Sequence, residues 1–151
     1  MNDTKPIIQK VVLGGVVIYN EKVLIVQRGA DEDVLPNLWE LPSGKKEDLE
    51  EAVDSLTREI KEETGLEVEP VLPFDVFNYQ VEKEDVIKDS TQINYLVKPK
   101  NGSEKPKVTI SSEHQNYAWV TLDQLNNYNL SDSVKKVIKK AFSVNKLLNG
   151  Q

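Results

Sequence analysis

GKKEDLEEAVDSLTREIKEETGL, residues 44–66, is the stretch of this sequence that decides the fold. Asp48 is a favourable helix N-cap, and Glu51 three residues later can complete a capping box, so the pattern predicts a helix that begins near Leu49. Gly65 can adopt the left-handed conformation that ends a helix. Between these signals, apolar residues recur at three- and four-residue steps and form a stripe that must pack on another element. The stripe consists of Leu49, Ala52, Val53, Leu56 and Ile60.

Three glutamates, Glu59, Glu62 and Glu63, crowd the last turn of this predicted helix. Their carboxylates project from neighbouring positions, where like charges repel one another. A Mg²⁺ ion would offset this repulsion, because it prefers oxygen ligands and is commonly held by a few carboxylates together with substrate phosphates. The helix alone is equally compatible with a solvated acidic face that has Arg58 and Lys61 as local counter-ions.

The spacing of the residues distinguishes these two interpretations. Gly44, Glu50 and the run from Arg58 to Leu66 match G-x5-E-x7-R-E-U-x-E-E-x-G-U, where U is a bulky aliphatic residue, at every defined position. A chance match is improbable when so many residue types are fixed at fixed spacing. The stretch resembles the Nudix box, and the chain is therefore identified as a member of the Nudix hydrolase family, similar to MutT-type nucleotide pyrophosphohydrolases.

The residues before the box also resemble this family, with two departures. Residues 39–44 read WELPSG, similar to the W-x-x-P-G-G approach to the box. Ser43 replaces the usual first glycine, and Asp48-Leu49 replaces the common Pro-Gly or a similar pair. Neither departure removes a carboxylate that the family uses for metal, so we expect any effect to be confined to the shape of the loop.

The resemblance implies a divalent metal site. Glu59, Glu62 and Glu63, together with the backbone carbonyl of Gly44, are the expected ligands of Mg²⁺, with Mn²⁺ as the alternative ion. Glu50 is expected to complete this site or to act through a bound water.

The resemblance also implies the residues that carry the reaction. Glu113 follows a loop where MutT-like proteins hold a further carboxylate, and it is our first expectation for the general base. Glu62 and Glu50 are the substitutes, because members of the family place this role differently. Arg58 is expected to orient a box glutamate through a bidentate ion pair.

Arg28 and Trp39 are the candidate substrate contacts. Arg28 opens a polar loop that borders the substrate cleft in this family, so it could meet a phosphate, although a surface arginine can equally have no role. Trp39 stands at the end of the same loop. His114 is the only histidine, and we expect it to be an exposed loop residue, because the box chemistry needs no imidazole.

Length and composition set broader limits. The 151 residues fit one domain, 1–151. With 19 basic and 25 acidic residues the net charge is −6, which disfavours binding to duplex nucleic acid. The absence of cysteine, of a signal-peptide pattern and of an apolar run near the ~20 residues that span a bilayer leads us to expect a cytoplasmic protein without a membrane partner, either monomer or homodimer.

The remaining sequence predicts strands and a second helix. We expect a hairpin from residues 11–19 and 23–27, further strands at 67–74, 76–81 and 91–97, and an amphipathic helix at 131–148. A capping box is expected at Thr121 and Gln124. Strands covered by helices give an α+β fold, and the resemblance sharpens this to the Nudix fold, an α/β/α sandwich with a mixed β-sheet.

The expected activity is hydrolysis of a nucleoside diphosphate linked to another group. A (deoxy)nucleoside triphosphate pyrophosphohydrolase that yields a monophosphate and pyrophosphate is the first expectation. A pyrophosphatase for ADP-ribose, nucleotide sugars or dinucleoside polyphosphates is the alternative, although ADP-ribose members tend to carry a proline near the position of Glu82, whereas Pro70 and Pro73 fall earlier. A nucleotide-binding module without catalysis is the alternative from another class.

Overall fold

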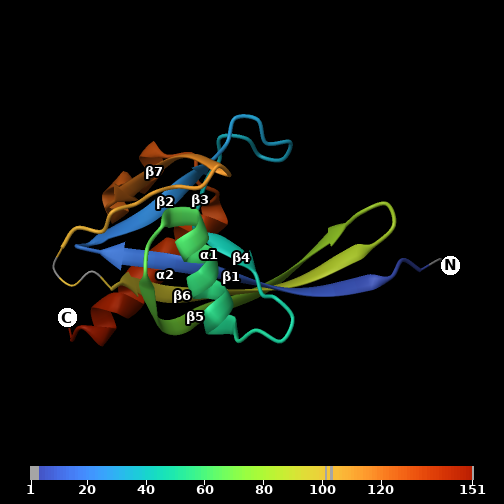
Figure 1. Ribbon diagram of the computed structural model, residues 1–151, viewed down its shortest axis with the longest axis horizontal. Coiled ribbons are helices and arrows are strands. Elements are labelled where there is room, and N and C mark those ends of the chain that lie inside the picture. The colour runs from blue at the N-terminus through green and yellow to red at the C-terminus, as the bar shows by residue number, and fades with distance from the viewer. Residues whose placement is uncertain (1–3, 101, 103, 151) are drawn as a thin grey trace.

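The computed structural model describes residues 4–100, 102 and 104–150 of the chain (Figure 1). Its strands are β1 (Ile7–Tyr19), β2 (Lys22–Arg28), β3 (Trp39–Glu40), β4 (Ser43–Lys45), β5 (Val68–Glu82), β6 (Ile87–Pro99) and β7 (His114–Val120). Its helices are α1 (Ala52–Thr64), the 3-10 helix η1 (Leu122–Asn127) and α2 (Asp132–Leu148). None of the helices in the described part of the chain combines the length and the apolar character that crossing a bilayer requires.

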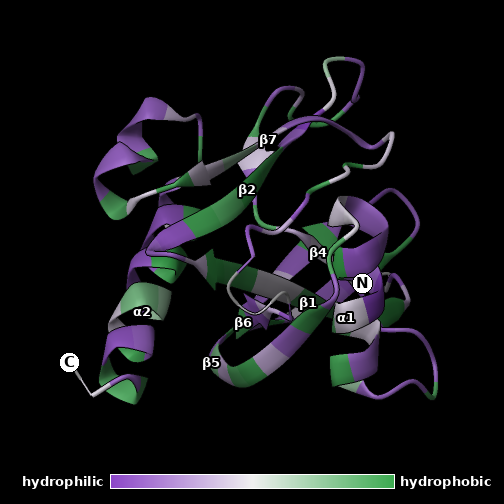
Figure 2. Ribbon diagram, turned by 60° about the vertical axis from the view of Figure 1, so that its left-hand side comes forward, coloured by the Kyte–Doolittle hydropathy of each residue, from purple (hydrophilic) through white to green (hydrophobic). Residues whose placement is uncertain are grey.

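The strands form a mixed sheet in the order β3-β2-β1-β6-β5, with β4 added to β1 and β7 added to β2. β1 runs parallel to β6 and antiparallel to β2 and β4. Figure 2 shows α1 and α2 on opposite sides of β1, β5 and β6. The predicted α+β fold, with helices on both faces of a mixed sheet, is confirmed.

β1 lies at the centre because both of its faces are buried. Successive residues of a strand point to opposite faces, so Leu13 and Val17 pack towards Ile60 of α1 while Val16 packs towards Ile138 of α2. All five of these side chains are completely buried. The continuous apolar run in β1 is the pattern expected of a strand covered on both sides.

The start of α1 differs from the prediction. The helix begins at Ala52, and Glu51 occupies the N-cap position without a side-chain capping bond. Leu49 cannot be in the first turn, because its backbone has a φ of 64° and its side chain is fully exposed. The predicted capping box from Asp48 and the place of Leu49 in the apolar stripe are therefore both wrong.

The predicted helix ends are confirmed where a capping residue is present. Gly65 has a φ of 75°, and its N–H donates to the Lys61 carbonyl at 2.8 Å. This left-handed conformation is readily available to glycine. At the start of α2, the Ser131 hydroxyl accepts a hydrogen bond from the backbone N–H of Val134 at 3.2 Å. The Gln124 side chain likewise accepts from the backbone N–H of Thr121 at 3.0 Å.

β5 and β6 are longer than predicted. The two strands expected at 67–74 and 76–81 are one strand, because register shifts at Pro70 and Pro73 accommodate the prolines without ending the pairing with β6. Between the predicted strands 76–81 and 91–97, the strands themselves extend to Glu82 and from Ile87, and they are joined by a turn in which the Lys83 N–H donates to the Val86 carbonyl at 2.8 Å. Residues 7–12, 76–82 and 87–92 therefore form a three-stranded extension, here called the arm, that projects beyond the helices in Figure 1.

Candidate active site

Gly44 brings β4 and α1 into close contact. A Cβ atom at this position would collide with the carboxyl group of Glu59. Only glycine therefore lets the backbone of β4 approach this carboxylate so closely. The structure thus brings together the backbone and the side chain that the sequence pairs as metal ligands.

Arg58 holds three glutamates of the box in place. Its Nε and Nη2 donate to the two carboxylate oxygens of Glu50 at 3.2 and 3.0 Å, while Nη1 contacts Glu59 at 2.9 Å and Glu62 at 3.5 Å. The hydrogen bonds from Arg58, and then that from the Ser55 hydroxyl, lower the pKa of Glu50 to about 2. The expected bidentate ion pair therefore forms between Arg58 and Glu50, and the Arg58 guanidinium also contacts Glu59 and Glu62.

Glu63 is a buried carboxyl group among other carboxyl groups. It is only 6% exposed, and burial is the main reason why its pKa rises to about 8. The charge of Glu59 adds to this rise, as do the charges of Glu113 and Glu40, whereas a hydrogen bond from the Ser43 backbone opposes it. Burial also raises the pKa of Glu59. Protons or a cation must therefore compensate the negative charge of this group.

Glu63 faces a small cavity of ≈ 180 Å³, here called the acidic pocket. Its lining comes from β2, β3, β4, α1, β7 and the loops beside them, and consists of Arg28, Glu32, Glu40, Ser43, Glu63, Glu113 and His114. Strand pairing produces this convergence, because β2 pairs with both β3 and β7 and so places Arg28 opposite His114. The pocket brings together three of the predicted site residues, Arg28, Glu63 and Glu113.

Glu40 and His114 are two of the four residues of this pocket to which the sequence assigned no site role, the others being Glu32 and Ser43. The Nε2 atom of His114 lies 2.9 Å from a carboxylate oxygen of Glu40, and Nδ1 is buried without a hydrogen-bond partner among the described residues. The expectation of an exposed loop histidine is wrong, because pairing of β7 with Arg28 in β2 carries the ring into the interior. Arg28 itself contacts Glu32 at 3.2 Å and Glu40 at 3.6 Å.

Trp39 lies in the core rather than in this pocket. It is 9% exposed, and its ring meets Tyr128 edge to face at a centroid distance of 5.0 Å. Its pairing with Gln27 fixes the position of β3. The structure therefore gives Trp39 a packing role, through which it places the neighbouring Glu40 at the pocket.

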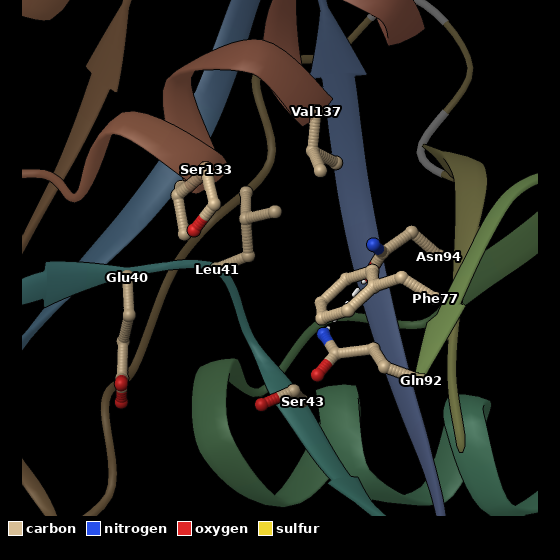
Figure 3. Close-up of a pocket in the computed structure, with 9 residues that line it drawn as sticks. Glu40, Leu41, Ser43, Phe77, Gln92, Asn94, Ser133 and Val137 are labelled. Carbon is tan, nitrogen blue, oxygen red and sulfur yellow. Dashed lines mark hydrogen bonds between the residues drawn. The ribbon is translucent and has the colours of Figure 1, made fainter. Parts of the chain in front are cut away.

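A second cavity, here called the amide pocket, adjoins the first and also measures ≈ 180 Å³. The two pockets share Glu40 and Ser43. Figure 3 shows that its side chains come from the β-strands on one side and from α2 on the other. The lining consists of Glu40, Leu41, Ser43, Phe77, Gln92, Asn94, Ser133, Val134 and Val137.

Hydrogen bonds fix the polar wall of the amide pocket. Gln92 Nε2 donates to Asn94 Oδ1 at 3.1 Å, and Asn94 Nδ2 donates to Asp75 at 3.1 Å. Lys140 of α2 approaches the other oxygen of Asp75 at 3.3 Å. Sequence reasoning did not select Gln92 and Asn94, although two amides on the same face of β6 as the apolar Leu96 are a signal that could have identified them.

The site fits a hard divalent cation in the chemistry of its donors. No three acidic or imidazole groups in the described ranges already converge as ligands of one ion. Arg58 engages Glu50, Glu59 and Glu62. The buried carboxyl group of Glu63 and the close approach of Gly44 to Glu59 nevertheless provide oxygen donors. Oxygen donors of this kind are the ligands that Mg²⁺ prefers.

Comparisons with known proteins agree with this geometry. The NUDIX domain family matches residues 10–141. The nucleoside triphosphatase NudI of Escherichia fergusonii is 30% identical over 120 residues, which cover 76% of this chain and 84% of that protein.

Solved structures share the fold at lower identity. A MutT protein from Methanosarcina mazei Go1 superimposes with a TM-score of 0.69 at 23% identity, covering 96% of this chain and 99% of that one. An ADP-ribose pyrophosphatase from Streptococcus suis gives a TM-score of 0.68 at 20% identity, covering 91% and 92%. At this level of sequence identity, the two solved structures show only that the fold is shared. The family match, by contrast, is a match of sequence over residues 10–141. The chain therefore belongs to the Nudix hydrolase family and is a pyrophosphohydrolase that acts on phosphoanhydride bonds.

Proposed function

We propose that this protein hydrolyses (deoxy)nucleoside triphosphates to a monophosphate and pyrophosphate, in the manner of MutT-like enzymes. The observation that carries the proposal is the shared wall of the two pockets, Glu40 and Ser43, which places a cavity for one planar ring beside the acidic groups. A nucleotide needs this combination of an apolar and amide-lined cavity with a cation-binding site. The nucleoside triphosphatase relatives support the same substrate class.

Glu59, Glu62 and Glu63, with the carbonyl of Gly44, would hold Mg²⁺ or Mn²⁺ in this proposal. When bound, the cation neutralises charge on the phosphoryl oxygens and lowers the pKa of a coordinated water. The chain supplies the position of these donors: Arg58 fixes the Glu59 carboxylate at 2.9 Å, and burial of Glu63 makes its ionised form favourable only beside a cation.

Glu113 is the best candidate for the general base. It is exposed at the rim of the acidic pocket, and no ion pair engages it in the described part of the chain. Glu50 is less suited, because the bidentate contact with Arg58 holds its pKa at about 2, and a base this weak accepts a proton poorly near neutral pH. Glu62 shares the same arginine. In this mechanism Glu113 accepts the proton of the attacking water.

Arg28 and the amide pocket orient the substrate in the proposal. Arg28 lines the acidic pocket, where its guanidinium can meet a phosphate oxygen. The nucleobase enters the amide pocket, where Phe77 and Val137 offer apolar contact and Gln92 offers an oriented amide. The proposal takes residues 1–151 as one domain, because residues from both halves of the chain line both pockets.

A release assay tests the proposed function. Pyrophosphate and phosphate would be measured with Mg²⁺ across canonical and oxidised nucleoside triphosphates, dinucleoside polyphosphates and nucleotide sugars. We expect pyrophosphate from triphosphates, loss of nearly all turnover in Glu63→Gln, and wild-type rates in the control Glu67→Gln, whose carboxylate is exposed and pairs with Lys61. Turnover confined to nucleotide sugars would refute the substrate class, and wild-type rates in Glu63→Gln would refute the metal role.

A further inference from the structure

One face of the arm carries side chains from three paired strands. Tyr79 of β5 lies opposite Ser90 of β6, which in turn lies opposite Lys10 of β1. The next row towards the tip consists of Val81, Lys88 and Ile8, and the previous row consists of Phe77, Gln92 and Val12. Partners directly opposite in a sheet project to the same side, so these rows form one continuous surface, here called the arm face.

The arm face carries Lys10 and Lys88 and no acidic residue, although the whole chain is acidic. Beside this face lies a broad cavity of ≈ 730 Å³ between β1 and the loop after β4, and its charged lining consists of Lys10, Lys45, Lys46 and Lys88 together with Glu47 and Asp48. Lys10, Lys45 and Lys88 form no ion pair with any of the described residues. Burial, followed by the charges of Lys88, Lys45 and Lys83, lowers the pKa of Lys10. Because these cations crowd one another without a partner, the surface favours an anionic ligand.

Exposed aromatic rings lie beside these lysines. Phe77 and Tyr79 are 38% and 37% exposed, and their ring centroids are 5.8 Å apart. Phe77 and Gln92 also line the amide pocket, so the arm face begins where that pocket ends. The order along the molecule is thus the acidic pocket, the amide pocket, a second aromatic ring, and then the lysines of the arm.

We propose that the arm face binds a short single-stranded nucleic acid that continues from the nucleotide held in the amide pocket. Basic grooves that follow the backbone, combined with aromatic rings on which bases stack, are the features that bind single strands without sequence preference. The proposal rests on the proposed function for the position of the first base. The next base stacks on Tyr79, and Lys10 and Lys88 contact the phosphates that follow it.

Binding of a fluorescein-labelled hexadeoxynucleotide in EDTA tests this proposal without hydrolysis. We expect Lys88→Glu to weaken binding at least about tenfold. A plot of the logarithm of the association constant against the logarithm of the salt concentration should also become less steep, by about 0.7 for each phosphate that the variant no longer neutralises. Tyr79→Ala should weaken binding about tenfold, because the base then has no ring on which to stack. The control Lys146→Glu makes the same charge change on an exposed lysine near the end of α2 and should bind like the wild type.

Three outcomes would overturn the proposal. The first is equal binding by Lys88→Glu and Lys146→Glu. The second is displacement of the strand by tripolyphosphate with no effect of Tyr79→Ala, since this would mean a simple anion site. The third is a change of oligomeric state in Lys88→Glu during sedimentation without a change in strand binding, since the face would then join two copies of the chain. Lys88→Glu is expected to hydrolyse triphosphates at the wild-type rate. If neither the wild type nor any variant hydrolysed triphosphates, the proposed function would be refuted, but the binding experiment could still be interpreted.

Discussion

Arg58 determines the arrangement of the acidic groups, because one guanidinium contacts Glu50, Glu59 and Glu62. Lysine keeps the charge but has no planar fork that could meet two carboxylates at fixed geometry. We expect Arg58→Lys to raise the Mg²⁺ concentration needed for half-maximal turnover about 10- to 100-fold, as is typical when a residue that orients a metal ligand is changed. Activity measured against Mg²⁺ concentration checks this, with Lys61→Arg as a charge-preserving control on the exposed side of the helix. An unchanged Mg²⁺ requirement would mean that Arg58 does not position the ligands.

The sequence predicted the part of the site that one helix contains. The family resemblance implied a bidentate ion pair between Arg58 and a box glutamate, and the partner is Glu50, only eight residues away. Glu40 and His114 are 74 residues apart and meet only because β3 and β7 flank β2. The pairing of distant strands is not encoded in local spacing, which explains why Glu40 and the buried state of His114 were missed.

At the scale of elements, the loop into α1 stores a removable strain. Leu49 stands in a left-handed conformation, which costs a non-glycine residue about 1–2 kcal/mol. Replacing Leu49 by glycine removes this strain, but the greater conformational freedom of glycine in the unfolded chain offsets about 0.4–1 kcal/mol of the stabilisation. We therefore expect Leu49→Gly to stabilise the protein by up to about 1 kcal/mol and to raise its Tm by about 2–4 °C. Thermal unfolding followed by circular dichroism checks this.

The matched control for this change is Leu147→Gly. Leu147 is also an exposed leucine, but it lies in the last turn of α2, where glycine lowers helix stability by up to about 1 kcal/mol. Opposite signs of the two Tm shifts are expected. A lower Tm for Leu49→Gly would show that the side chain, and not the backbone conformation, determines stability at this loop.

The strand boundaries show what local patterns leave out. The hairpin between β1 and β2 was foreseen, and Asn20 and Glu21 adopt the positive φ values of 51° and 61° that a tight two-residue connection requires. The length of β5 was not foreseen, because Pro70 and Pro73 are local signals for a break. Pairing with β6 overrides these signals through register shifts, and this pairing is a tertiary effect.

At the scale of the whole molecule, a group of carboxylates and a group of lysines lie in separate cavities. The acidic groups gather where α1, β3 and β4 meet, whereas the lysines line the cavity between β1 and the loop after β4. The family resemblance was sufficient to predict the layered fold. It did not predict the arm face, because the exposure of a strand depends on where the covering helices end, and this is decided by packing of the complete chain.

Stability without metal should depend on pH through Glu63. Its pKa rises to about 8 in the folded protein, against an ordinary value near 4.3, so the folded state binds a proton that the unfolded state releases. Because the pKa is higher in the folded state, the protonated carboxyl group adds to the free energy of unfolding. This stabilisation is complete below about pH 4.3 and is lost as pH rises through about 8, by at most about 1.4 kcal/mol per pH unit. In EDTA, the Tm of wild type relative to Glu63→Gln should therefore fall between pH 5.5 and 8.5.

Mg²⁺ should reverse this loss, because a cation that binds only the folded, ionised site stabilises it by mass action. Thermal unfolding at pH 5.5, 7.0 and 8.5, with EDTA or with Mg²⁺, measures both effects in the same two proteins. We expect Mg²⁺ to raise the wild-type Tm most at pH 8.5, where Glu63 is ionised most readily, and to leave the Tm of Glu63→Gln nearly unchanged at every pH. If Mg²⁺ instead stabilised both proteins equally, the cation would bind elsewhere, and the buried carboxyl group would be neutral for reasons of packing alone.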